Sequence, residues 1–225
     1  MTLIPLQPPY SWGANTFNRP NKPLRENMRH FISMSLFAGL LIGIAGLVFL
    51  HVGGLGGAAL FAFGLMSVTL CQALLFTGKA GYLPYKESLQ LIPMVLYNAI
   101  GCLITAYIAY YTMSEASLAR LDTIMAAREA ASWHGLIATS TGTGIIVTLA
   151  LYGSRKGNYL PLLYGVPVFI MCGLPHCIAD AFYYWVAILD GDFAMWMVGA
   201  WLLSVVGNYI GCNLPRWFMG KTFEM

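Results

Sequence analysis

The stretch GVPVFIMCGLPHCIADAF, residues 165–182, decides the fold of this chain. It belongs to an apolar run at 160–189 that is long enough to cross a bilayer, but its prolines remove backbone hydrogen bonds and clash with the preceding helical turn. Broken backbone at membrane depth survives only where protein buries it or where it lines a wet cavity. His176 directly follows Pro175, and an ionisable residue at this depth indicates a functional site. The stretch therefore predicts a membrane helix that is interrupted at a polar site.

The composition places the whole chain in the same setting. Of its 225 residues, 58% are hydrophobic and only 9% are charged, whereas soluble domains carry about 25% charged residues. The mean hydropathy is +0.67, so membrane lipid is the expected partner of most of the surface. A net charge of +3 without a basic cluster argues against nucleic acid as a partner. The five cysteines all lie in apolar runs, where we expect them to pack rather than to form disulfides.

Charge placement fixes the expected topology. Apolar runs long enough to span a bilayer lie at about 32–52, 55–76, 89–112, 134–153, 160–189 and 193–214. With the N-terminus inside, every Lys and Arg except Arg120 and Arg128 falls on the inner side, as the positive-inside rule requires. We therefore predict an all-α protein of the cell (inner) membrane with both termini cytoplasmic. Its predicted parts are an N-terminal segment 1–30, a transmembrane domain 31–215 and a C-terminal tail 216–225.

A second interruption and a short repeat divide the chain into halves. LFTGKAGYLP at 75–84 contains two glycines and Pro84, which interrupt the end of the second span. YNAIGC at 97–102 and GNYIGC at 207–212 lie in the last span of each half. Because each half has an odd number of spans, the halves must have opposite orientations in the membrane. The sequence predicts two inverted three-helix repeats with broken second and fifth helices, a plan typical of transporters.

Polar residues at the two interruptions are the candidate pore residues. His176 is the candidate protonatable group, and Asp180 lies one turn later on the same helical face. Asp180 is either the buried partner of His176 or a charge at the outer mouth. At the other interruption, Thr77 offers a hydroxyl and Phe76 an apolar plug, although Thr77 is equally typical of an ordinary helix end.

Further polar residues each have two interpretations. Asn98 and Asn208, one in each repeat copy, either brace a broken helix or line the pore. Thr139, in the run ATSTGTG at 138–144, either bonds its own helix backbone or lines the pore. Lys79 is either an anion-attracting charge in a vestibule or an interfacial lysine that snorkels. No HExxH, CxxC, GxSxG or phosphate-binding glycine loop is present, so we expect no enzyme activity, no cofactor and no metal site.

In this order, the motifs resemble those of the formate/nitrite transporter family. LFTGK is similar to the family's LFTGN loop, YNAIGC and GNYIG are similar to its GNLIG-type motifs, and GLPHCIADAF resembles its FEHSIANMF pattern. The resemblance implies an aquaporin-like homopentamer with one pore in each protomer, which conducts formate, nitrite, hydrosulfide or similar anions. It implies that His176 is the central pore histidine, Thr77 its hydrogen-bonding partner, Phe76 a constriction and Asn208 the asparagine of the sixth helix.

The sequence departs from the family pattern at residues that touch the expected pore. Lys79 and Thr139 stand where the family usually has asparagine, and so does Asp180. Pro175 replaces a glutamate. These departures bear on the solute more than on the fold.

The predicted function is a channel or transporter for small monovalent weak-acid anions, with proton-linked passage past His176. Protonation removes the charge that an apolar constriction opposes, and an imidazole titrates in the useful range, with an ordinary pKa of about 6.5. Whether the proton comes from His176 or from solvent stays open at this point. The alternatives are a pore for a neutral or cationic solute such as urea or ammonia, which Asp180 favours, and a membrane subunit without transport activity.

Overall fold

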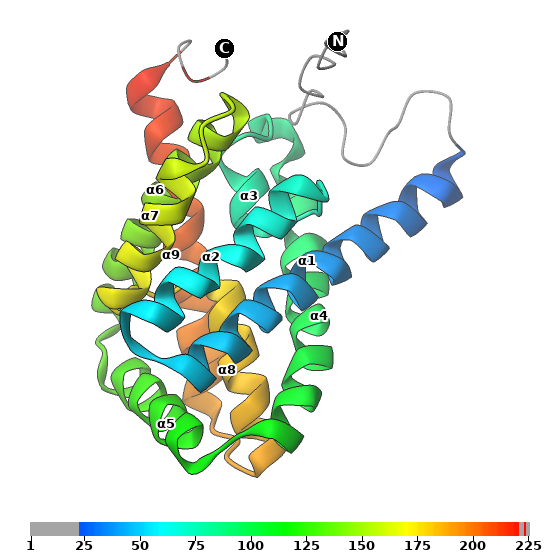
Figure 1. The fold of residues 1–225 in the computed structure, drawn as a ribbon. Helices are drawn as coiled ribbons and strands as arrows, with labels where there is room; N and C mark the ends of the chain where they lie inside the picture. Colours follow the sequence, from blue (N-terminus) through cyan, green and yellow to red (C-terminus); the bar gives the residue numbers. More distant parts are fainter. Residues whose placement is uncertain (1–22, 221–222, 224–225) are drawn as a thin grey trace, which may run out of the picture.

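The computed structural model describes residues 23–220 and Phe223; the remainder of the predicted terminal segments lies outside the described residues. Every element in this part of the chain is helical (Figure 1). The elements are α1 (Leu24–Val52), α2 (Gly54–Leu70), α3 (Phe76–Ala80), the 3-10 helix η1 (Tyr85–Gln90), α4 (Leu91–Thr112), α5 (Glu115–Ala130), α6 (Trp133–Arg155), α7 (Leu160–Met171), α8 (Cys177–Asp190) and α9 (Met195–Met219).

Four helical segments of the described chain are long and apolar enough to cross a membrane by themselves. They are Arg25–Val52, Tyr85–Thr112, Trp133–Arg155 and Met195–Met219. The other two predicted spans each contain two helices, α2 with α3 and α7 with α8. The all-helical, membrane-type architecture expected from the composition is therefore confirmed.

Non-helical backbone at 71–75 and 172–176 separates the paired helices. At the first of these sites Gln72 has a φ of 54°, and at the second Gly173 has a φ of 65°. Both values lie in the left-handed region, which ends a right-handed helix. Pro175 lies inside the second site, whereas Pro167 is accommodated within α7. The prolines that look alike in sequence thus have different structural effects.

The long helices approach one another at backbone distance, and glycine makes this possible. A Cβ atom on Gly39 of α1 would collide with the carbonyl oxygen of Asn98 on α4. A Cβ atom on Gly144 of α6 would collide with the carbonyl oxygen of Asn208 on α9. Small residues at helix contacts are typical of membrane proteins, where close van der Waals packing replaces the hydrophobic effect. The same contact therefore occurs in α1–α4 and in α6–α9.

Helix α5 lies across one end of the molecule, and the C-terminal end of α9 lies at the other (Figure 1). Ser114 caps it by accepting a hydrogen bond from the Ser117 amide, at 3.3 Å. Its buried face is formed by residues spaced three or four apart: Ser117, Leu121, Met125 and Arg128. The sequence analysis assigned this segment to the outer side without recognising a helix in it.

We expect α5 to face the outside of the cell and η1 to face the inside. A thiol reagent that cannot cross the membrane should therefore label Ala126→Cys on α5, an exposed position, in intact cells. The matched variant Lys86→Cys on η1, also exposed, should be labelled only after permeabilisation. Both changes are made in a chain whose exposed native cysteines, Cys71 and Cys172, are replaced by serine. The opposite labelling pattern would invert the predicted topology.

Candidate functional site

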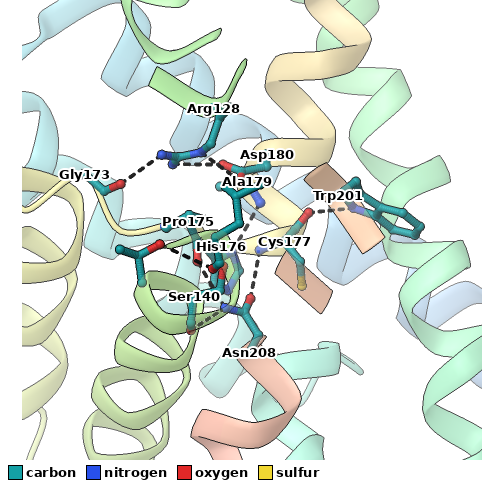
Figure 2. A network of polar contacts seen from close by, with 12 residues as sticks. Arg128, Ser140, Gly173, Pro175, His176, Cys177, Ala179, Asp180, Trp201 and Asn208 are labelled. Carbon is teal, nitrogen blue, oxygen red and sulfur yellow. Dashed lines mark hydrogen bonds and ion pairs between the residues drawn. The ribbon is translucent and has the colours of Figure 1, made fainter. Parts of the chain in front are cut away.

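His176 lies at the start of α8, in the interruption that follows α7. The side chain is 3% exposed, and its Nδ1 atom accepts a hydrogen bond from the Ala179 amide at 3.2 Å (Figure 2). Its Nε2 atom lies 3.0 Å from the Thr77 hydroxyl oxygen on α3. A neutral imidazole that accepts at Nδ1 carries its proton on Nε2. His176 therefore donates to Thr77, and this bond joins the two interruptions.

Asn208 holds the backbone on both sides of His176, where the interruption meets α8. Its side-chain oxygen accepts from the Cys177 amide at 2.8 Å (Figure 2). Its side-chain nitrogen donates to the carbonyl oxygens of Pro175, at 3.0 Å, and Ser140, at 2.8 Å. The Cys177 amide and the Pro175 carbonyl are groups that an interrupted helix cannot satisfy by itself, whereas the Ser140 carbonyl belongs to the continuous helix α6. The contacts are those of a brace.

Asn98 makes the same set of contacts at the other interruption. Its side-chain oxygen accepts from the Phe76 amide at 2.8 Å. Its side-chain nitrogen donates to the carbonyl oxygens of Leu74, at 2.9 Å, and Ser35, at 2.7 Å. Asn98 and Asn208 are both fully buried. Each asparagine thus ties a helix start, a loop and a neighbouring long helix together.

Two cysteines of the repeated motif connect the halves. The Cys102 thiol lies 3.3 Å from the carbonyl oxygen of Ile178 on α8. The Cys212 thiol lies 3.4 Å from the carbonyl oxygen of Thr77 on α3. Each motif therefore braces the interruption of its own half through asparagine and contacts the short helix of the other half through cysteine.

A cavity of about 180 Å³ adjoins His176 on the α5 side. Phe61 and Phe169 form part of its wall, and the ring of Phe169 lies stacked 5.8 Å from the His176 ring. Phe61 meets Phe169 edge to face at 6.2 Å. Phe169 thus contacts the histidine ring and Phe61 packs against Phe169, and no pattern in the sequence singles out either residue.

Arg128 and Asp180 form a buried ion pair at the same cavity (Figure 2). The guanidinium donates to both carboxylate oxygens, from Nε at 3.1 Å and from Nη2 at 3.3 Å, and to the Gly173 carbonyl oxygen at 2.9 Å. Burial acts to lower the pKa of Arg128, but the carboxylate outweighs it, so the pKa is raised and the guanidinium stays charged. The partner of Asp180 is therefore Arg128 on α5, and not His176.

These features can be compared with known proteins. A family model described as "Formate/nitrite transporter" matches residues 14–215, which is most of the chain. The chain belongs to the formate/nitrite transporter family. No curated protein matches the sequence.

Two solved structures share the fold of this family member. One, described as "Pentameric formate channel with formate bound", matches with a TM-score of 0.74 at 18% identity, over 87% of this chain and 98% of its own. The other, described as "FNT family ion channel", matches with a TM-score of 0.74 at 18% identity, over 88% of this chain and 90% of its own. At this identity the likeness concerns the fold alone.

The other predicted site residues of this family member lie apart from the cavity. Phe76 is buried, but its side chain faces an apolar groove between α4 and α9, lined also by Val95 and Trp201. Thr139 lies on the exposed side of α6, and its hydroxyl donates to the Gly135 carbonyl oxygen at 2.7 Å. The structure therefore does not bring Thr139 to His176.

Lys79 lies at the opposite end from α5, in a setting of cations and aromatic rings. It is 5% exposed and close enough to Arg155 for their charges to interact. The Arg155 guanidinium lies 3.1 Å from the ring centre of Tyr82. The ring of Phe223 stacks on that of Tyr82 at 4.7 Å and on that of Tyr152 at 5.5 Å. This end of the site thus combines positive charge with a stacked aromatic cover.

We predict that both asparagine braces are needed for stability. Asn98→Ala and Asn208→Ala each remove the side-chain partner of one backbone N–H and one carbonyl group at an interruption, at about 1–3 kcal/mol for each unsatisfied group. Each variant should lower the apparent Tm in detergent by roughly 5–10 °C or more. Lys86→Ala, at an exposed position of η1, is the control and should change it little. A large effect at only one of the two asparagines would contradict their equivalence.

Proposed function

We propose that this family member is a channel for small monovalent anions of weak acids, such as formate, nitrite or hydrosulfide, with proton-linked passage past His176. The observation that carries the proposal is the His176–Thr77 contact, which puts a polar, protonatable pair where two interrupted segments meet. A plain membrane scaffold does not need such a pair. Membership in the formate/nitrite transporter family and the likeness to a formate channel agree with this function.

The proposed architecture has six membrane crossings in two inverted three-segment repeats. In it, α2 with α3 and α7 with α8 form the broken second and fifth segments. The matching contacts of Asn98 and Asn208, and of Gly39 and Gly144, support a common plan for the two halves. The orientation that agrees with the charge distribution puts both termini in the cytoplasm and the protein in the inner membrane.

The protein assembles as a homopentamer in this proposal, like the pentameric formate channel that shares its fold. Two apolar grooves, of about 480 and 550 Å³, run along α4, α8 and α9. The second groove is bordered by the exposed Phe193, the half-buried Trp185 and the buried Tyr184. These faces are suited to contacts with neighbouring protomers or with lipid.

The hydrogen bonds of His176 favour a particular source for the proton. Its Nδ1 atom already accepts the Ala179 amide, at the positive end of α8, so the ring can gain a second proton only by giving up that bond. Donating the Nε2 proton without such a gain would leave an imidazolate. We therefore propose that the solute takes its proton from water in a vestibule and crosses the centre as the neutral acid. His176 remains neutral, and its Nε2–H, which donates to Thr77 in this structure, turns to the acid as it passes.

Asp180 no longer supports the alternative of a cationic or neutral solute. As an isolated acid near the pore, it would attract a cation such as ammonium. Both of its oxygens instead accept hydrogen bonds from Arg128. The pair carries no net charge, so this residue does not argue for a cation pathway.

Purified protein in liposomes should carry weak-acid anions but not urea. Formate uptake should rise as the external pH falls, because the protonated fraction grows by about tenfold for each pH unit. Neutral acids also cross lipid alone, so liposomes without protein set the baseline. Flux of urea without flux of formate, nitrite or hydrosulfide would overturn the proposed function.

His176 variants test its role as a hydrogen-bond donor. His176→Asn keeps a residue suited to cap α8 and an N–H donor, but it cannot titrate. It should keep the pH dependence of formate uptake while the rate falls, by about tenfold for the loss of one aligned hydrogen bond. His176→Phe should block uptake. If His176→Asn removes the pH dependence, the histidine itself supplies the proton.

A further inference from the structure

Arg128 and Asp180 form the charged part of the α5-side cavity. Among the described residues that line it, they are the only two with a formal charge, and His176 and Tyr183 are the neutral titratable groups. Arg128 comes from α5 and Asp180 from α8, and both side chains are at most 10% exposed. Any solute that reaches His176 from this side passes beside the pair.

Stability alone does not account for this pair. Burying two charges costs several kcal/mol for each ion, and replacing a buried pair with well-packed apolar residues is often neutral or stabilising. The geometry of the pair also affects the charge that the cavity presents to a solute. Because both carboxylate oxygens accept from one guanidinium, the two charges cancel within the cavity wall.

We propose that the Arg128–Asp180 pair determines which form of the solute enters from the α5 side. This rests on the proposed function. With Asp180 in place, the charge of Arg128 is compensated, so the cavity does not concentrate the bare anion and admits the neutral acid. With Asp180 neutralised, Arg128 would be a cation in a poorly solvated wall, which attracts anions strongly. Asp180 is thus a specificity-determining residue that keeps Arg128 from acting as an anion site.

The test compares three variants with the parent in liposomes. Formate uptake is measured at about pH 8, where formate is ionised, and at about pH 5, where the acid form is more abundant. Asp180→Asn keeps the shape and one acceptor for Arg128, and should raise uptake at the higher pH by on the order of tenfold. Arg128→Gln should give no such gain. The double variant, which is also without a net charge, should lose the gain of Asp180→Asn.

Whether formate uptake rises or falls in these variants distinguishes an effect of charge from a purely structural role of the pair. If the pair only holds α5 in place, Asp180→Asn lowers uptake and the double variant lowers it at least as far, which overturns the proposal. If the parent itself carries no formate, the proposed function fails, whatever the variants do.

A further variant tests the inference without disturbing the ion pair. Thr123 lines the same cavity from the exposed side of α5, and its hydroxyl donates to the Ala119 carbonyl oxygen and not to the ion pair. Thr123→Lys adds a cation and should raise formate uptake at about pH 8, whereas Thr123→Gln, of similar length and neutral, should not. Equal effects of the two changes would show that charge at this cavity does not select the solute.

Discussion

The structure depends on how two pieces of interrupted backbone satisfy their polar groups inside an apolar protein. Each interruption leaves amide and carbonyl groups that no helix pairs, and lipid offers them no partner. Asn98 and Asn208 each supply one acceptor and one donor to these groups, and a second donor to a carbonyl of a continuous long helix. Because an asparagine can do both at once and carries no charge, it is well suited to this task. The close packing of α1 on α4 and of α6 on α9 brings each brace into place.

The two halves share this scaffold but differ where the polar site forms. Asn98 accepts from the amide of Phe76, and Asn208 accepts from the amide of Cys177. The residue before each of these amides is therefore equivalent in the two halves: it is Leu75 in the first and His176 in the second. The histidine therefore has no counterpart in the first half. Its partner, Thr77, comes from the opposite interruption one residue beyond the braced amide. The two halves thus share a scaffold but form an asymmetric site, in which the His176–Thr77 hydrogen bond joins residues that are not equivalent in the two halves.

The sequence predicted the features that depend on neighbouring residues. Apolar runs indicated the spans, Pro175 marked the interruption at 172–176, and the setting of His176 marked it as a site. The glycines and Pro84 of 75–84 misplaced the other interruption, which lies at 71–75 in a stretch without glycine or proline, while Gly78 lies inside α3. The sequence did not predict features that depend on contacts between residues far apart in the chain. Nothing local connects Asp180 with Arg128, which lies 52 positions away on a helix that the apolar pattern did not reveal. On α6, a shift of one residue separates a residue that contacts the site from one that does not. The Ser140 carbonyl oxygen accepts from Asn208, whereas Thr139 lies on the exposed side because successive helical residues are rotated about the helix axis.

Prediction of the aromatic wall shows a similar limit. Phe76 adjoins Thr77 in sequence, and this proximity made it the candidate for an apolar constriction. The start of a helix places consecutive side chains about 100° apart, so Thr77 faces His176 while Phe76 faces the groove between α4 and α9. Phe61 and Phe169 border the histidine instead, from helices whose sequences contain many apolar residues of equal appearance. Only the packing of α2 against α7 selects these two.

The charges at the two ends of the site have different consequences for a weak acid. The α5 end carries a compensated pair, whereas the other end brings Lys79 and Arg155 together beside aromatic rings. In a passive pathway such an asymmetry cannot drive net transport, because a vestibule that binds an anion more strongly also releases it more slowly. If the proposed function holds, it changes which form of the solute each end collects. The direction of flow then follows from the gradients of the acid and of protons.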